Sequence, residues 1–167
     1  MYINIAGYSS GAQDMKFAKQ ESAGYLVNHL ARLFARGLST RIKPIGLTTG
    51  TFPALLELWE TDGLTQKELV DRLDIEQATM ANTLARMERD GLVVRKKHPS
   101  DGRAQRVFLT DRARSLRDPA LSEAMKENDD MLAGLTTPER EAFIGLVQKI
   151  ILSKQKDADR DAPSGNA

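Results

Sequence analysis

The chain has 167 residues, and its 24 Lys and Arg residues nearly balance 23 Asp and Glu residues, so the formal net charge at pH 7 is +1. It contains no cysteine, which excludes disulfides, zinc-thiolate sites and thiol-based redox sensing. Only two histidines are present, far apart in the sequence, so we expect no dedicated transition-metal site and assign no metal ligand.

Both ends of the chain are predicted to be loose. Residues 1–20 contain Gly and Ser with weak periodicity, and residues 154–167 are polar with no apolar face. No apolar run approaches the length of a membrane span, and the first residues lack the basic and then apolar profile of a signal peptide. We therefore expect a cytoplasmic protein.

Two helices are predicted in the first third of the chain. Apolar residues recur at helical spacing from about Phe17 to Lys43, and Pro44 is expected to stop that helix. A second helix is predicted over residues 48–62, where Pro53 must lie in the first turns or bend the helix.

A short helix with a well-marked start is predicted next. Thr65 can cap it, and Glu68 three residues later can accept a hydrogen bond from the amide of Thr65. The apolar residues on its inner side are Leu69, Val70 and Leu73.

A tight turn then leads to another helix from about Glu76 to Asp90, which Gly91 ends. Its inward-pointing residues at helical spacing are Met80, Leu84 and Met87. Glu76 is a poor N-cap compared with Asp or Ser, which leaves the fine geometry of this helix start open.

The outer face of that second helix is small and polar. Alanines would allow the helix to approach the edges of base pairs, and Gln or Asn can bind adenine with two hydrogen bonds. The predicted base-reading residues are Gln77, Ala78, Ala81 and Asn82. The predicted backbone-contacting residues beside them are Thr79, Arg86 and Arg89. An ordinary solvated helix face is the alternative.

A basic β-hairpin follows the helix. Leu92 to Val94 open one strand and Arg106 to Leu109 form its partner, with a turn at Pro99 to Gly102. Arg103 would lie near the tip and suits the negative potential of a narrow minor groove. The residues expected on the arms, where they would meet phosphates, are Arg95, Lys96, Lys97 and Arg106. A hairpin that is merely exposed to solvent is the alternative.

Beyond the hairpin the chain is predicted to be helical again. Thr110 can cap a long helix that Pro119 should kink early. The side of this helix that is expected to be buried is a mainly apolar stripe at helical spacing, which consists of Leu121, Met125, Asn128, Leu132 and Leu135. A last helix begins with a second Thr-x-x-Glu box, Thr136 and Glu139. Its face is too apolar for solvent and consists of Phe143, Ile144, Val147, Ile150 and Ile151.

These terminal helices predict a homodimer. One subunit cannot cover both the amino-terminal and the carboxy-terminal apolar stripes, so the simplest burial interlocks the helices of two subunits about a twofold axis. The interface would include Leu132 and the apolar face of the last helix. Two recognition helices one helical turn of DNA apart would then read a pseudo-palindrome.

Together these elements predict a mainly α fold, with a small β-hairpin wing, a winged helix-turn-helix lobe and a dimerisation lobe made of the terminal helices. Such a lobe indicates a protein that binds double-stranded DNA. An enzyme is not expected, because the chain has no cysteine, no Gly-rich phosphate loop and no HExxH pattern. A winged-helix module that binds protein without DNA readout is the alternative, although such a module would not need the basic hairpin.

The segments GLTTGTFPALLELWETDGLTQKELVDRL and MERDGLVVRKKHPSDGRAQRVFLT resemble the MarR (multiple antibiotic resistance regulator) family of transcription factors. The resemblance covers residues 24–152 and includes the Asp101-Gly102-Arg103 wing signature. It implies that Arg103 enters the minor groove and that Asp101 helps to position the wing. It also implies a twofold dimer.

The resemblance further implies regulation by a small molecule. Family members bind small aromatic, often anionic, effectors where the dimerisation helices meet the winged lobe, and repressors outnumber activators among them. The conceivable lining residues here are Tyr25, His29 and Trp59. The alternative is that Tyr25 and Trp59 are ordinary core residues and that His29 is a buried histidine with its hydrogen bonds satisfied. No resident cofactor is expected.

The resulting division of the chain is a flexible arm (1–20), an amino-terminal dimerisation helix (21–47), a winged helix-turn-helix domain (48–110), carboxy-terminal dimerisation helices (111–153) and a disordered tail (154–167).

Overall fold

The computed structural model describes residues 18–97 and 105–161, with side chains up to residue 155. In chain order, the elements are α1 (Ala23–Ile42), the 3₁₀ turn η1 (Lys43–Ile45), α2 (Phe52–Glu60), β1 (Leu64–Thr65), α3 (Gln66–Leu73), α4 (Gln77–Arg89), β2 (Val93–Lys97), β3 (Gln105–Leu109), α5 (Asp111–Ser115), α6 (Arg117–Met131) and α7 (Thr137–Asp161).

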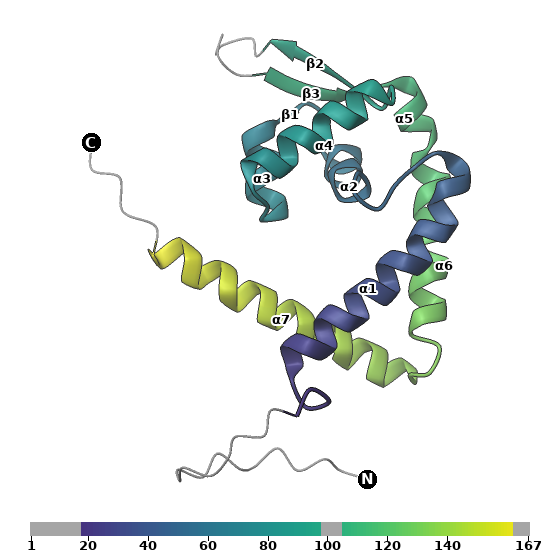
Figure 1. Ribbon diagram of the computed structural model, residues 1–167, viewed down its shortest axis with the longest axis vertical. Helices are drawn as coiled ribbons and strands as arrows, with labels where there is room; N and C mark the ends of the chain where they lie inside the picture. Colours follow the sequence, from purple (N-terminus) through teal and green to yellow (C-terminus); the bar gives the residue numbers. More distant parts are fainter. Residues whose placement is uncertain (1–17, 98–104, 162–167) are drawn as a thin grey trace.

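The molecule has two parts of different character. The short elements from α2 to α5 gather at one end and form the winged lobe, while the long helices α1, α6 and α7 extend away from it as the helical arms (Figure 1). The predicted fold class, mainly helical with a small sheet, is therefore confirmed.

The start of α3 is fixed by the predicted capping box. The Thr65 hydroxyl accepts a hydrogen bond from the Glu68 amide at 3.2 Å, and the Glu68 carboxylate accepts one from the Thr65 amide at 2.6 Å. Glu76 occupies the N-cap of α4 and makes no side-chain cap hydrogen bond, as expected for a poor cap. Gly91, with φ of 66°, follows the helix in the left-handed region that glycine favours.

The sheet has three antiparallel strands in the order β1-β3-β2. The predicted hairpin is confirmed as β2 and β3, although β2 begins at Val93 and not at Leu92, and β3 begins at Gln105 and not at Arg106. Val93 lies opposite Leu109 and Lys97 opposite Gln105. Strand β1 was not predicted, because two residues are too short to show alternation. It pairs Leu64 with Val107 and so joins the start of α3 to the wing.

The hydrophobic core lies in the winged lobe and at its junction with the arms. The inward residues of α4, Met80, Leu84 and Met87, are each 0% exposed, which confirms their predicted direction. Among the residues whose side chains are described, every buried apolar side chain lies between Ile42 and Ala120. The winged lobe thus encloses its own core.

Two predicted helix starts need correction. Helix α1 begins at Ala23, well after Phe17, because the Ser22 hydroxyl caps it by accepting a hydrogen bond from the Tyr25 amide. Helix α2 begins at Phe52, not at residue 48, because residues 48–51 form a turn before it. Pro53 then lies in the first turn, where its missing N–H costs nothing.

The long helix expected after the wing is in fact two helices. Thr110 caps α5, and the break falls at Leu116, ahead of Pro119, which lies in the first turn of α6. Pro119 cannot donate to the carbonyl of Ser115, and its ring would clash with that carbonyl in a continuous helix. The kink predicted at Pro119 is therefore a break in the helix, and it lies about one turn earlier, at Leu116.

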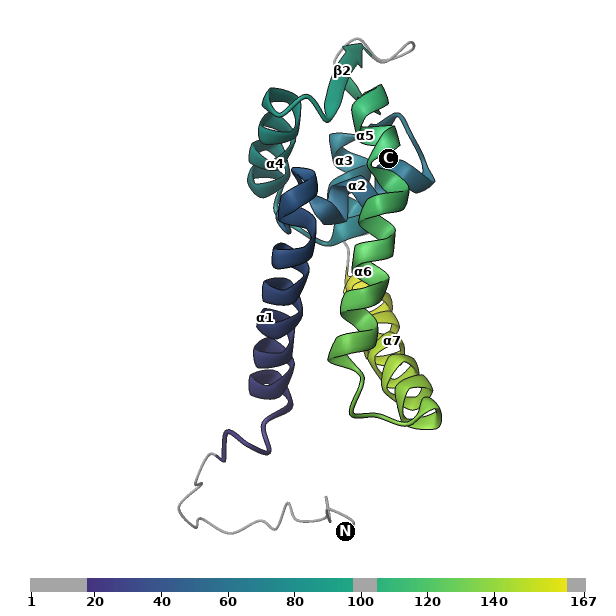
Figure 2. The same cartoon turned by 90° about the vertical axis from the view of Figure 1, so that its right-hand side faces the viewer.

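The side of α6 that is buried against α1 is not the predicted stripe. Met125 of that stripe is 67% exposed, whereas Ala120 and Glu127 of α6 are buried. Figure 2 shows α1 and α6 running along each other. A small residue, Gly37, makes room for the Glu127 carboxylate, which accepts a hydrogen bond from Arg41 Nε at 2.9 Å. An ion pair thus takes the place of an apolar contact at this crossing.

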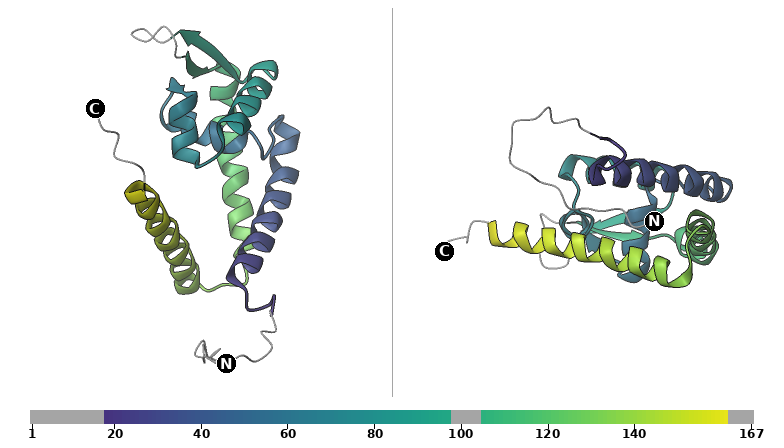
Figure 3. Two further views of the ribbon diagram at one scale, coloured as in Figure 1. Left: turned by 60° about the vertical axis from the view of Figure 1, so that its left-hand side comes forward. Right: turned by 90° about the horizontal axis from the view of Figure 1, so that it is seen from below.

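Helix α7 stands apart from α1 and α6 and diverges from them (Figure 3). Its start carries the predicted second box, in which the Glu139 carboxylate accepts hydrogen bonds from the Thr136 amide and hydroxyl. The helix continues to Asp161, past residue 154 where the tail was expected to begin. Most of the expected arm, residues 1–17, lies outside the described residues.

Candidate nucleic-acid interface

Helix α4 lies at the surface of the winged lobe with one side buried and the other open. The buried side consists of Met80, Thr83, Leu84 and Met87. The opposite arc carries Ala78, Asn82 and Ala85, all exposed. At 13 residues, the helix is long enough, about 20 Å, to cross a major groove.

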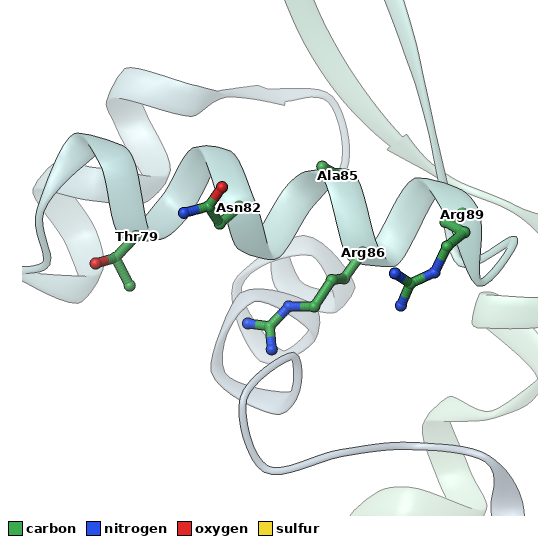
Figure 4. A pocket seen from close by; sticks show the side chains of 5 residues that line it. All are labelled: Thr79, Asn82, Ala85, Arg86 and Arg89. Carbon is green, nitrogen blue, oxygen red and sulfur yellow. The ribbon is translucent and has the colours of Figure 1, made fainter.

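One side of α4 borders an open hollow. Its lining side chains are Thr79, Asn82, Ala85, Arg86 and Arg89, and Figure 4 shows them following one another along the helix. None of these five is acidic, so the hollow suits a polyanion. Ala85 was not among the predicted site residues.

Arg86 reaches from α4 toward the turn before α2. Its guanidinium lies 3.6 Å from where a Cβ on Gly50 would be, and it donates to the Thr83 hydroxyl at 3.3 Å. Within the described part of the chain it pairs with no carboxylate. Its charge is therefore available to a phosphate on this side of α4.

The four predicted base-reading residues occupy different positions around α4. Asn82 and Ala78 are exposed on the outer arc, and Ala81 is half-buried. Gln77, the first residue of the helix, is turned toward α3, where Gln66 donates to its side-chain oxygen at 3.1 Å. Gln66 was missed by sequence reasoning, since only the packing of α3 against α4 brings the two together.

Two of the predicted phosphate-contacting cations lie in ion pairs. Arg89 donates to Asp90 at 3.1 Å, and Arg95 Nε lies 3.3 Å from a Glu88 carboxylate oxygen. Both arginines are thus partly neutralised by acids on or next to α4.

The pleat of the hairpin separates the remaining cations. Lys96 and Arg106 lie opposite each other in the sheet and share one face, while Arg95 and Lys97 share the other. Lys96 Nζ lies 5.1 Å from the centre of the Phe108 ring, a cation–π distance. Arg103 and Asp101, the predicted wing residues, lie outside the described residues.

Asp62, which sequence reasoning did not single out, anchors the base of the wing. Its carboxylate accepts hydrogen bonds from the Leu109 amide at 2.9 Å and from Arg114 Nη2 at 2.6 Å. The Asp62 hydrogen bond raises the pKa of Arg114 above its ordinary value. The sequence signal was the Asp62-Gly63 turn dipeptide directly before β1.

A second anchor joins α5 to the end of α4. The Arg112 guanidinium donates to the Asp90 carbonyl and lies over Gly46, the residue that follows η1. A cation at the C-terminus of α4 is favoured by the helix dipole. The C-terminal end of α4 is thereby tied to the connection from α1.

The predicted ligand-lining residues fall in two places. Tyr25 and His29 contact each other edge-to-face at 6.2 Å in the first turns of α1. Trp59 belongs to α2, packs on Phe52, and donates its indole N–H to the Ala113 carbonyl at 3.0 Å. The beginning of α1 and helix α2 lie at different ends of the molecule (Figure 1).

The predicted dimer-interface residues are largely open. The exposed fractions are 47% for Ile144, 38% for Val147, 62% for Ile150 and 51% for Ile151, while Leu132 and Phe143 are partly exposed. Within the described residues, no cluster of His, Cys, Asp and Glu is suited to a metal ion, and no helix is both long and apolar enough to cross a membrane.

Comparison with known proteins agrees with this geometry. The sequence model of the MarR family matches residues 45–104. The HTH-type transcriptional repressor Rv2887 of Mycobacterium tuberculosis is 29% identical over 136 residues, which cover 81% of this chain and 98% of the relative. The HTH-type transcriptional regulator TtmR of Methylorubrum extorquens is 31% identical over 72% of this chain and 60% of its own length.

Solved structures show the same likeness. A MarR transcriptional regulator from Methanosarcina mazei superposes with a TM-score of 0.74 at 26% identity, covering 80% of this chain and 96% of that one. A crystal structure of Rv2887 in complex with DNA gives a TM-score of 0.61 at 26% identity, covering 77% and 97%. The chain therefore belongs to the MarR family of winged helix-turn-helix transcriptional regulators, a family of regulators and not of enzymes.

Proposed function

We propose that this regulator is a homodimeric repressor that reads a pseudo-palindromic operator with α4 in the major groove. The observation that carries the proposal is the acid-free hollow along α4, where Asn82 is exposed between Thr79 and Arg86. Asn82 would bind a base edge, and Arg86 would bind a phosphate beside it. The solved complex of Rv2887 with DNA supports a DNA partner.

The dimer is supported by the arms. Ile150 and Leu146 of α7 are each 62% exposed, and Val27 of α1 is 63% exposed. A second copy of the chain would cover these residues and place two α4 helices on successive turns of DNA. Repressor activity is supported by the similarity to Rv2887, which is a transcriptional repressor.

We further propose that a small aromatic or anionic effector releases the repressor from DNA, a property that the family resemblance implies. The chain itself would carry no catalytic activity and would act in the cytoplasm. A winged-helix module that binds only protein would have no use for an acid-free hollow along α4.

The proposal is tested by selecting DNA from a random library with the purified protein, and by measuring affinity for the selected operator against salt. Asn82→Ala should lose about 1–3 kcal/mol at one base pair while leaving other positions unchanged. Arg86→Ala should weaken binding to all sequences and reduce the slope of log affinity against log salt by about 1.

The control variant is Lys126→Ala, which removes one cation from α6, where Lys126 pairs with Glu123. Affinity and salt slope should be unchanged in this variant. If Asn82→Ala weakens all sequences equally, its base-reading role is wrong. If the wild-type protein selects no sequence at all, the operator-reading proposal fails.

The wing assignment is tested separately. Arg103→Ala should lower both operator affinity and salt slope if this arginine enters the minor groove. Unchanged values for both would contradict that role.

A further inference from the structure

The starts of the two helices of the helix-turn-helix are joined by a pair of glutamines. Gln66 is the first residue of α3, and Gln77 is the first residue of α4. Gln66 Nε2 donates to Gln77 Oε1 at 3.1 Å and lies 3.4 Å from the Gln77 carbonyl oxygen. The contact therefore engages both the side chain and the backbone of Gln77.

The backbone of Gln66 is fixed by the hydrogen bonds of the residue before it. It directly follows Thr65, which forms the capping box with Glu68 and pairs with Arg106 in the sheet. Its backbone is thus fixed at the meeting point of α3 and the sheet, and its own side chain is half-buried. Gln77, by contrast, is exposed at the start of a helix that lacks a side-chain cap.

The chemistry of a carboxamide makes this contact directional. A Gln side chain has one acceptor oxygen and one NH₂ donor, and rotation by 180° exchanges them. Because Gln66 donates to Gln77 Oε1, the oxygen is held toward α3 and the NH₂ group of Gln77 keeps both N–H donors available. Without that contact, either end of the carboxamide could face a base.

We infer that Gln66 is a specificity-determining positioning residue, which orients the Gln77 carboxamide so that its NH₂ group reads a hydrogen-bond acceptor in the major groove. The inference rests on the proposed function, in which the start of α4 meets base edges. The acceptor that suits it is the N7 atom of a purine. Adenine is favoured, since the second lone pair of Gln77 Oε1 can accept from its N6 amino group.

The test uses the full chain and the operator that the wild-type protein selects. Every base is then substituted at each position of one half-site, and the preference for the best base over the others is measured for each variant. Gln77→Ala should identify the position read by Gln77, with a loss of preference of about 5- to 150-fold there. Gln66→Ala should reduce preference at that same position by about 2- to 10-fold.

Gln66→Glu gives the sharper outcome. A carboxylate cannot donate to Gln77 Oε1, but it can accept from Gln77 Nε2, so the Gln77 carboxamide should turn its oxygen to the groove. The preference should then move away from adenine, whose N7 acceptor would face the carboxamide oxygen, and toward cytosine, whose N4 amino group offers a donor. The added negative charge should weaken all sequences alike, which leaves the ratios between bases interpretable.

Lys67→Ala is the matched control, because Lys67 is the exposed neighbour of Gln66 on α3. It should leave the ratios between bases unchanged. The Gln66→Ala and Gln77→Ala effects should be non-additive in the double variant, because the first acts only through the second. Thermal unfolding of each variant checks that the winged lobe remains folded.

The outcomes separate the two proposals. If the wild-type protein selects an operator but Gln77→Ala changes no base preference, the inference is wrong and the operator-reading function stands. If Gln77→Ala removes a preference that Gln66→Ala and Gln66→Glu leave intact, the inference is also wrong. If the wild-type protein selects nothing, both fail.

Discussion

The winged lobe and the helical arms differ in how they bury apolar surface. The winged lobe encloses side chains such as Leu55, Leu69 and Leu84, each 0% exposed. The arms leave Val27 and Ile150 more than half exposed, at 63% and 62%. Exposed apolar helix faces of this kind mark an interaction surface, which supports the proposed dimer of the arms, whereas the winged lobe buries its apolar side chains within one chain.

The two parts also differ in what joins their helices. Apolar side chains fill the centre of the winged lobe. Where α1 meets α6, the contact includes the small residue Gly37 and the ion pairs of Arg41 with Glu127, Glu123 and Asp130. The Glu127 hydrogen bond raises the pKa of Arg41 above its ordinary value. The close approach at Gly37 and the charges around Arg41 thus contribute to the spacing of α1 and α6.

The largest effect is expected from a substitution that disrupts the proposed dimer interface of the arms and leaves the winged lobe unchanged. Ile150→Glu should place an unpaired carboxylate in each half of the dimer interface, at a cost of about 3–5 kcal/mol per buried charge. Sedimentation should show monomers at concentrations where the wild-type protein is dimeric, and operator affinity should fall with them. Lys149→Glu, on the polar side of the same helix, is the control. A dimer that survives Ile150→Glu would contradict the assignment of this face.

The second largest effect is expected from a substitution in the core of the winged lobe. Leu84→Ala removes a fully buried side chain from the centre of the winged lobe and should lower the free energy of unfolding by about 2–5 kcal/mol. Because the winged lobe has its own core, the loss should persist in the monomeric Ile150→Glu background and should not depend on protein concentration. A loss that vanished in that background would show that the winged lobe depends on the arms.

A smaller effect is expected at the α1–α6 contact. A Cβ on Gly37 would fall 1.9 Å from a Glu127 carboxylate oxygen, whereas one on Gly24 of the same helix would meet nothing within 4 Å. Gly37→Ala should therefore destabilise by about 1–3 kcal/mol despite the better helix propensity of alanine. Gly24→Ala should be neutral or stabilising. Equal effects in urea unfolding would mean that the two helices do not need this close approach.

The sequence predicted what short-range patterns determine and missed what packing determines. The capping box of Thr65 and the inward residues of α4 follow from local spacing, and both were predicted. The buried side of α6 was missed because Glu127 is charged, and only the Arg41 partner from a distant helix allows its burial. Gln66 was missed for a similar reason, since its partner Gln77 is brought to it by a turn and not by periodicity.

The smallest expected effect compares the same capping motif in the two parts. The pKa of Glu68 in the winged lobe is lowered first by the backbone hydrogen bond from Thr65, then by the hydroxyl and by Arg106 and Arg72. The pKa of Glu139 at the start of α7 is lowered first by the Thr136 hydroxyl and then by its amide.

Removing the hydroxyl should therefore raise the pKa of Glu139 in Thr136→Ala more than that of Glu68 in Thr65→Ala, since Glu68 keeps its larger backbone contribution and its two arginines. Both pKa values lie below that of an unfolded Glu, so each carboxylate stabilises the folded protein above the unfolded value, about 4.3. That stabilisation is lost as the pH falls through the folded value. Carboxyl carbon chemical shifts followed from pH 7 to pH 2 measure both sites in one titration. Equal shifts in the two variants would show that the hydroxyl contributes alike in both boxes, and that the arginines around Glu68 do not set the winged lobe apart.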